Sequence, residues 1–222
     1  MFPDVTIVMT TYFPDVHRRS LAEETLRSWV ENLRYNGDLH LHCADDGSNH
    51  IWHPELIWKG PITYSYQERR GVGASLNRGF PKAFETSPYV LYAVDDWWLA
   101  YPIDFTHWVM VLEEREDVGM VRLGPPHPNI RGHVEAFTDY WNSWGLRLDR
   151  YGFAFGHRPA LYSQRMIESY GWFEEGVSAL ECERLYAEKF AQTEGPDIVL
   201  SLSSPWYHTS TESLSAIEPE NK

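Results

Sequence analysis

Three apolar segments of this chain each end at a cluster of polar or acidic residues. The segments are residues 5–9, 39–43 and 89–94, and the clusters that follow them are Thr10-Thr11-Tyr12, Asp45-Asp46 and Asp95-Asp96. Residues 5–9 and 89–94 are typical of buried strands, and residues 39–43, where Leu39, Leu41 and Cys43 alternate with histidines, are typical of a half-buried one. The helical periodicity between the first two strands indicates parallel strands joined by a crossover helix. Because the carboxyl ends of parallel strands meet at one edge of a sheet, the three clusters are predicted to lie close together.

Strands and helices are predicted to alternate along the rest of the chain. Further strands are expected near residues 62–65, 118–123, 151–155, 198–202 and 206–208, and helices at 20–36, 72–84, 105–115, from 163, and at 178–192. A capping-box pattern, Ser20 to Glu23, marks the start of the first helix. Residues 124–128 and 136–144 are expected to be irregular. The pattern predicts one α/β domain with a Rossmann-like, mostly parallel central sheet and helices on both faces.

Composition excludes several functional classes. The 222 residues carry 19 basic and 32 acidic side chains, a formal net charge of −13, which argues against general nucleic-acid binding. The two cysteines, Cys43 and Cys182, form no zinc knuckle or disulfide framework. The first residues lack the basic and apolar segments of a secretion signal, and the most hydrophobic stretch is interrupted by Asp95 and Asp96. A cytoplasmic protein without a membrane span is therefore expected.

The adjacent carboxylates Asp95 and Asp96 are the most specific chemical feature. Neighbouring carboxylates in a partly buried site repel one another unless one is protonated or a cation compensates them. Mg²⁺ and Mn²⁺ prefer carboxylate and phosphate oxygens, so the pair indicates a metal–diphosphate site. A solvated turn would explain the same dipeptide.

A glycine-rich segment, Arg69-Arg70-Gly71-Val72-Gly73, stands at the predicted start of a helix. Glycines let backbone N–H groups approach an anion and the arginines add positive charge, so Arg70 and Gly73 are candidates to flank a diphosphate. The segment is not a dinucleotide-binding fingerprint, because Leu76 stands where the third glycine would be.

Four motifs, in the order in which they occur, resemble those of family 2 glycosyltransferases with the GT-A fold. They are Val5–Tyr12, Ala44–Ser48, Arg70–Gly79 and Leu91–Trp97, and a weaker match continues at Gly171–Glu175 and Glu181–Glu183. The resemblance implies a nucleotide-sugar-binding half at about residues 1–123, an acceptor-binding and catalytic half at about 124–215, and a frayed tail at 216–222. Short stand-alone proteins that look similar also occur in bacterial viruses.

The resemblance implies roles for the donor-side residues. Thr10–Tyr12 would line the nucleotide pocket, Asp46 would accept from the base or ribose, and Asp45 would support that loop. Asn77 would lie near the nucleotide, although a polar residue on an exposed helix face is the commoner explanation.

The resemblance also implies a metal site. Asp95 and Asp96 correspond to the family's Asp-x-Asp motif, with Trp97 where a third acidic residue often stands. This departure makes Asp96 the expected ligand for Mn²⁺ or Mg²⁺, supported by Asp95. His208 resembles the late histidine that completes the metal shell in some GT-A enzymes, but it could equally be a hydrogen-bonded structural residue.

The catalytic base is expected at the start of the late helix. The family has a Glu-Asp pair there, and the match is Leu180-Glu181, so Glu181 is the first candidate base and Glu183 its substitute. Glu181 could instead be the second half of a capping box with Ser178. His157 and Arg158 are candidates to shape the acceptor side.

The sequence thus predicts a metal-dependent, inverting glycosyltransferase. It would move a single sugar from a nucleoside-diphosphate sugar, with UDP favoured, to a hydroxyl on a glycan, a protein or a modified base. Two alternatives stay open: a non-catalytic GT-A-like protein that binds nucleotide sugar or glycan, and a sugar nucleotidyltransferase. The second lacks support because residues 10–14 are not the basic glycine-rich loop such enzymes have after the first strand.

Overall fold

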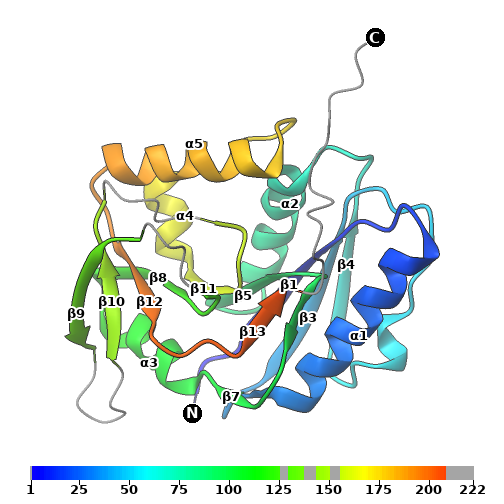
Figure 1. The fold of residues 1–222 in the computed structure, drawn as a ribbon, viewed down its shortest axis with the longest axis horizontal. Coiled ribbons are helices and arrows are strands. Elements are labelled where there is room, and N and C mark those ends of the chain that lie inside the picture. The colour runs from blue at the N-terminus through cyan, green and yellow to red at the C-terminus, as the bar shows by residue number, and fades with distance from the viewer. Residues whose placement is uncertain (1, 126–129, 138–143, 151–155, 209–222) are drawn as a thin grey trace.

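The computed structural model describes residues 2–125, 130–137, 144–150 and 156–208 (Figure 1). Within these ranges there is one nine-stranded sheet and two two-stranded sheets. In spatial order the large sheet contains β4 (Ile62–Tyr66), β3 (Leu39–Asp45), β1 (Val5–Thr11), β5 (Tyr89–Val94), β11 (Ala160–Ser163), β8 (Val118–Arg122), β12 (Asp197–Ser201), β10 (Trp144–Leu148) and β9 (Gly132–Ala136). The small sheets pair β13 (Trp206–His208) with β6 (Trp97–Leu99), and β2 (Leu33–Arg34) with β7 (Ile103–Asp104). The helices are α1 (Val16–Asn32), α2 (Val72–Phe84), α3 (Thr106–Glu114), α4 (Gln164–Tyr170) and α5 (Ala179–Gln192), with a 3-10 helix η1 (Pro54–Leu56).

The part of the large sheet formed by the first half of the chain is parallel. β4, β3, β1 and β5 are neighbours and run in the same direction. Beyond them β11 is antiparallel to both β5 and β8, β12 is parallel to β8, and β10 and β9 complete the sheet as antiparallel strands. The predicted α/β architecture is therefore present, and the second half of the chain adds antiparallel strands to it.

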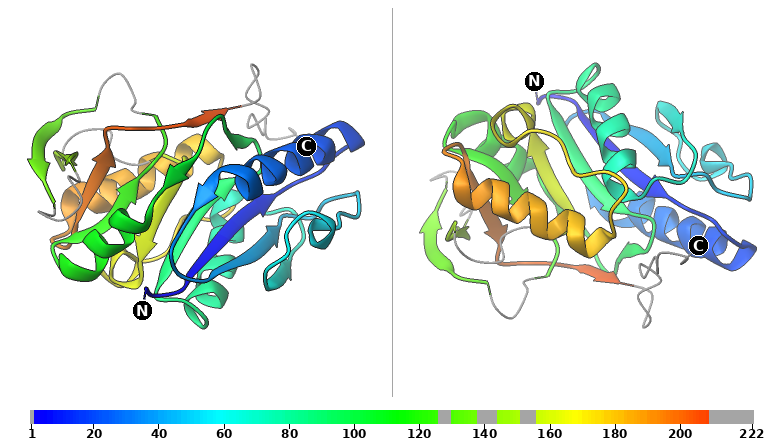
Figure 2. Two further views of the ribbon diagram at one scale, coloured as in Figure 1. Left: turned by 90° about the horizontal axis from the view of Figure 1, so that it is seen from below. Right: turned by 90° about the horizontal axis from the view of Figure 1, so that it is seen from above.

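The central strand β1 contributes to two apolar cores. Val5, Ile7 and Met9 belong to the core that includes buried residues of α1 and α3, whereas Val8 belongs to the core with α2, α4 and α5. Successive strand residues point to opposite faces of a sheet, so one strand can serve both cores. Figure 2 shows α1 and α3 over one face and α5 over the other, which confirms the predicted helices on both faces.

Helix α1 begins earlier than the capping-box pattern predicts. Asp15 is its N-cap and accepts a hydrogen bond from the backbone N–H of Arg18 at 2.8 Å. Ser20 lies inside the helix, where its hydroxyl donates to the carbonyl of Val16 at 3.1 Å. Aspartate and serine are comparable N-caps, so the local sequence offers two starting points and the predicted one is wrong. The helix also ends earlier, at Asn32.

Strands β9 and β10 were not predicted, and they reach into the expected irregular segment 136–144 at Ala136 and Trp144. Residues of β9 are mostly exposed, so no alternating apolar pattern marks it in the sequence. It pairs with β10 along its whole length, and charged contacts add to this pairing: Arg147 on β10 donates to Glu135 on β9 at 2.8 Å and to Asp197 on β12 at 2.6 Å. The expected irregular residues at 126–128 and 138–143, the expected strand at 151–155 and the tail at 216–222 fall outside the described residues. No helix in the described ranges is long and apolar enough to cross a membrane.

A buried histidine on β3 makes the stability of the fold depend on pH. His42 is 1% exposed, and its ring nitrogens lie 2.8 Å from Thr63 Oγ1 and 3.0 Å from Ser65 Oγ. Burial, assisted by the charge of Lys82, lowers the pKa of His42 to about 4 from its ordinary 6.5. Between these values the unfolded chain binds a proton that the folded chain does not, so the free energy of unfolding rises with pH.

We expect the lowered pKa of His42 to contribute about 3 kcal/mol to the free energy of unfolding at pH 7. This contribution is lost as the pH falls from 6.5 to 4. Urea unfolding at closely spaced pH values would measure the slope, and His42→Gln should flatten it across that window. Burial also lowers the pKa of His157, to about 3. His157 therefore adds a pH dependence of the same sign to the wild type and to His42→Gln. An unchanged slope in His42→Gln would contradict the assignment.

Candidate active site

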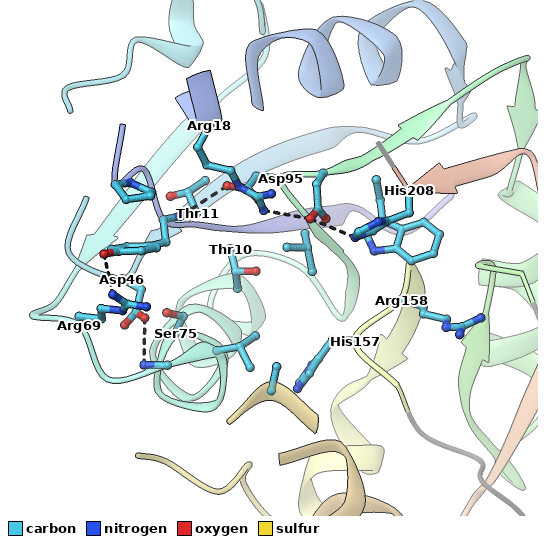
Figure 3. A pocket seen from close by; sticks show the side chains of 18 of the residues that line it. Thr10, Thr11, Arg18, Asp46, Arg69, Ser75, Asp95, His157, Arg158 and His208 are labelled. Atoms are coloured by element: carbon cyan, nitrogen blue, oxygen red, sulfur yellow. Dashed lines mark hydrogen bonds and ion pairs between the residues drawn. The ribbon is translucent and has the colours of Figure 1, made fainter. Parts of the chain in front are cut away.

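A cavity of about 690 Å³ lies where β1, β3 and β5 end (Figure 3). The strand register brings Thr11 beside Asp45 and Thr10 beside Val94, so the ends of the three strands are level with one another. Eight residues predicted for the site line the cavity: Thr10, Thr11, Tyr12, Asp46, Asp95, Asp96, Glu183 and His208. Five others predicted for the site do not line it: Asp45, Arg70, Gly73, Asn77 and Glu181. Three further polar side chains that sequence reasoning missed do line it, Asp15, Arg18 and Ser75, and so does Arg69, from the segment predicted to flank a diphosphate.

Asp45 organises the loop beneath the cavity. Its carboxylate accepts hydrogen bonds from Thr11 Oγ1 at 2.9 Å and from the backbone N–H groups of Gly47 and Ser48 at 3.0 and 2.8 Å. Gly47 has φ 84°, a left-handed conformation that favours glycine, and this lets the chain turn back at once. Asp45 therefore supports the loop and does not face the cavity.

Asp46 joins that loop to the start of α2. It is buried and accepts from Gln67 Nε2 at 2.7 Å and from the backbone N–H groups of Arg70 and Gly71 at 2.8 and 2.9 Å. These bonds hold the first turn of α2 against the cavity. Gly71, with φ 89°, makes the sharp entry into the helix. Asp46 thus fixes a wall of the cavity whether or not it also contacts a ligand.

Of the adjacent residues Arg69 and Arg70, Arg69 lines the cavity. Its Nη1 donates to Tyr12 Oη at 2.8 Å, and its guanidinium carbon lies 4.2 Å from the centre of the Tyr12 ring. This cation–π pair forms a flat, positively charged wall. Arg70 points away and pairs with Glu175 at 2.8 Å.

Asn77 and Gly73 act on the structure behind the cavity. The side chain of Asn77 donates to the carbonyl of Phe173 and accepts from the N–H of the same residue, both at 2.9 Å. Gly73 packs so closely that a Cβ atom there would lie 2.0 Å from the carbonyl oxygen of Glu174. Both residues therefore dock α2 against residues 173–175 and do not line the cavity.

Asp95 and Asp96 follow β5 and are both buried in the cavity wall. Arg18 donates from Nη2 to Asp95 Oδ1, and from the same nitrogen to Asp96 Oδ2 at 3.0 Å. His208 Nε2 lies 3.1 Å from that Oδ2. In Figure 3, Arg18 and His208 reach toward the end of β5 from opposite sides.

The two carboxylates differ in acidity. Burial raises the pKa of Asp95 more than the charge of Arg18 lowers it. Burial also disfavours the ionised form of Asp96, but the hydrogen bond to His208 and the charge of Arg18 outweigh it and lower the pKa of Asp96. Asp96 is therefore the more acidic of the two carboxylates.

Asp96 and His208 fit a divalent ion that is bound together with a phosphate group. Their facing atoms are 3.1 Å apart, which matches neighbouring ligand positions around an octahedral ion with bonds of about 2.1 Å. Across the described ranges no three His, Cys, Asp or Glu side chains form a metal-binding group, so the described residues would offer two donors, Asp96 and His208. Mg²⁺ is commonly held in this way, by one or two protein ligands with substrate phosphates and water.

Glu183 is the acidic side chain that α5 contributes to the cavity. It accepts a hydrogen bond from the backbone N–H of His157 at 2.5 Å. Burial raises its pKa, against the opposing effects of that hydrogen bond and of the charges of Arg158 and Arg122. His157 and Arg158 also line the cavity, on the side that the sequence associated with the acceptor.

Glu181 lies outside the cavity, on a different side of α5 from Glu183. Its carboxylate accepts two hydrogen bonds from Arg184, at 2.8 and 2.6 Å, and is 41% exposed. Ser178 caps α5 by accepting from the backbone N–H of Glu181 at 3.2 Å, which is the half of the capping box that the structure contains. The helix start is as predicted, but the two glutamates point in different directions.

The sheet order and the strand-end cavity together define the GT-A fold, and comparison with solved structures confirms it. S. aureus TarS 1–349 in complex with UDP-GlcNAc superposes with a TM-score of 0.62 at 13% sequence identity, over 94% of this chain and 59% of that one. Its complex with UDP gives a TM-score of 0.63 at 13% identity, over 93% and 60%. The mannosyltransferase PcManGT from Pyrobaculum calidifontis, in complex with GDP-Man and Mn²⁺, gives 0.55 at 18% identity, over 90% and 57%.

This chain therefore spans about three fifths of the length of these structures. No protein-family model and no curated protein matches the sequence. At identities this low the likeness establishes the fold alone.

Proposed function

We propose that this protein transfers a single sugar from a nucleoside-diphosphate sugar to a hydroxyl group of an acceptor. The observation that carries the proposal is that one cavity takes in the strand-end residues Asp46, Asp95 and Asp96 together with Glu183 from α5. In open α/β sheets, ligands bind at this edge. Proteins of the same fold hold UDP-GlcNAc, or GDP-Man with Mn²⁺, and this supports a nucleotide sugar as the ligand.

The donor is bound on the strand side of the cavity. The wall formed by Tyr12 and Arg69 offers a flat surface to the base and positive charge to a phosphate, while Thr10 and Thr11 supply hydroxyl groups. A divalent ion, Mn²⁺ or Mg²⁺, held by Asp96 and His208 would neutralise charge on the diphosphate when bound. The proposed donor base is uracil, with guanine as the first alternative to test.

Glu183 is the proposed catalytic base. It accepts the proton of the acceptor hydroxyl while the hydroxyl oxygen bonds to the anomeric carbon of the sugar. The bond from that carbon to the diphosphate oxygen breaks, and the nucleoside diphosphate leaves with the electron pair. Attack from the side opposite the leaving group inverts the anomeric configuration. The raised pKa of Glu183 makes its carboxylate a stronger proton acceptor than an exposed glutamate.

These roles assign different functions to the two halves of the chain. Residues up to about 123 would bind the nucleotide sugar, and residues from about 124 to 215 would bind the acceptor and carry the base. We also propose that the protein belongs to family 2, that it is related to the short virus-type proteins, and that it is located in the cytoplasm. The acceptor would be a glycan, a protein or a modified base.

Thermal unfolding with UDP, GDP, dTDP and CMP, each with and without Mn²⁺, tests the donor site. A ligand at a hundred times its dissociation constant should raise the free energy of unfolding by about 2.7 kcal/mol. We expect one nucleoside diphosphate to stabilise the protein in this way, and Asp96→Ala to weaken the effect in the presence of Mn²⁺. If none of the four nucleotides raises the unfolding temperature under either condition, the proposed function is wrong.

A further inference from the structure

We propose that Arg18 holds Asp96 in the metal-free protein and moves to the diphosphate when the nucleotide binds, so that divalent metal and nucleotide bind cooperatively. This inference rests on the proposed function, because it assigns a residue that couples the two ligands of the donor site. It makes Arg18 a positioning residue of the donor site.

Arg18 and a metal ion would compete for one oxygen atom of Asp96, Oδ2. Asp96 Oδ2 accepts from Arg18 Nη2 at 3.0 Å and lies 3.1 Å from His208 Nε2. This oxygen and the His208 nitrogen are the two atoms whose spacing fits a divalent ion. A metal bound by both residues would share Oδ2 with the Arg18 guanidinium, whose positive charge opposes the binding of a second cation there.

Arg18 has donors ready for a second partner. Its bonds to Asp95 and Asp96 both use Nη2, and within the described residues no acceptor is bonded to Nε or Nη1. The guanidinium group has five N–H donors in a plane, an arrangement that suits phosphate oxygens. Arg18 also lines the cavity in which the diphosphate is proposed to bind.

The backbone of Arg18 is fixed while its side chain has a choice of acceptors. Asp15, the N-cap of α1, accepts from the N–H of Arg18 at 2.8 Å and anchors the first helical turn. A side-chain movement is therefore sufficient for the exchange. The Arg18 side chain is 12% exposed, so leaving it without an anionic partner would be unfavourable.

The charges of the cavity explain why metal and diphosphate need each other. Five acidic and three basic side chains line it: Asp15, Asp46, Asp95, Asp96 and Glu183, with Arg18, Arg69 and Arg158. A diphosphate entering this acidic cavity requires further positive charge, and a metal entering alone leaves Arg18 without its carboxylate. When both bind, the metal takes Asp96 and the phosphate oxygens take Arg18, and each ligand favours the other by the same factor.

The experiment measures Mn²⁺ binding by the loss of its free-ion electron paramagnetic resonance signal, without nucleotide and with saturating UDP or GDP. The proteins are the wild type, Arg18→Gln, Arg18→Lys and the control Asp96→Asn. We expect Arg18→Gln to bind Mn²⁺ alone at least about tenfold more tightly than the wild type, because a competing cation has been removed. Arg18→Lys keeps the competing charge and should stay close to the wild type.

The enhancement of Mn²⁺ affinity by nucleotide should be smaller in Arg18→Gln than in the wild type. Phosphate oxygens that bind the metal directly give some enhancement in every variant, so the difference between variants is the part due to Arg18. If Arg18→Gln folds less stably, Mn²⁺ alone should raise its unfolding temperature and leave that of the wild type nearly unchanged.

Equal Mn²⁺ affinity and equal enhancement in the wild type and Arg18→Gln, with binding lost in Asp96→Asn, would overturn this inference and leave the proposed function standing. No Mn²⁺ binding in any protein, with or without nucleotide, would also overturn it. Failure of UDP and GDP to stabilise any of the proteins would instead contradict the donor site itself.

Discussion

Replacing Glu183 with glutamine should lower the turnover number by a factor of about 10² to 10⁴ and leave nucleotide affinity unchanged. A general base contributes a rate factor of this size, and the amide of glutamine cannot take the acceptor's proton. The carbonyl oxygen of the new amide can still accept the hydrogen bond that His157 N–H donates to Glu183 at 2.5 Å, so the local structure should be kept. Hydrolysis of the nucleotide sugar, with water in place of the acceptor, provides an assay that needs no knowledge of the acceptor.

Glu181→Gln is the matched control, since it makes the same chemical change two residues away on the same helix. Glu181 is exposed and bonded to Arg184, so its loss should change turnover by less than a factor of about two. If Glu181→Gln is the inactive variant and Glu183→Gln the active one, the proposed base is wrong. If neither protein nor the wild type turns over any donor while nucleotide still binds, the chain is a non-catalytic nucleotide-sugar-binding protein.

The fold was predictable where burial imposes a clear period on the sequence. β1 and β5 are buried runs, β3 alternates apolar residues with histidines, and each of the three is followed by a polar residue that lines the cavity. Helix α2 was predicted from its buried apolar face, which includes Leu76 and Phe80. Strand β9 was not predicted, because most of its residues are exposed and leave no apolar pattern, although it pairs with β10 along its whole length.

The site was predictable for residues next to strand ends and much less so for residues on helices. A strand end fixes both the position and the direction of Asp46, Asp95 and Asp96. Arg18 comes from the first turn of α1, and the sequence pattern placed the helix start after it, so nothing indicated that it would reach the cavity.

Neighbouring residues of the same type were the hardest to separate. Arg69 and Arg70 are adjacent, and which of them faces the cavity depends on the two backbone bonds from Asp46 to the turn. Glu181 and Glu183 are two residues apart on a helix, about 200° around its axis, so only one can face the cavity. The register that decides between them is set by the packing of α5 and is not visible in the local sequence.

Gly73→Ala should lower the free energy of unfolding by about 3 kcal/mol, although alanine is the better helix former by about 1 kcal/mol. The added Cβ would lie 2.0 Å from the carbonyl oxygen of Glu174 and 3.2 Å from Cys182 Sγ. That carbonyl cannot move away cheaply, because Asn77 holds the neighbouring Phe173 through both its N–H and its carbonyl group. Overpacking against a fixed backbone outweighs helix propensity, and urea unfolding would measure the difference.

Lys82→Ala, in the same helix, is the control. Lys82 is exposed and paired with Glu85, so its removal should change the free energy of unfolding by no more than about 0.5 kcal/mol. A Gly73→Ala protein as stable as the wild type would mean that α2 is not tightly docked on residues 173–175.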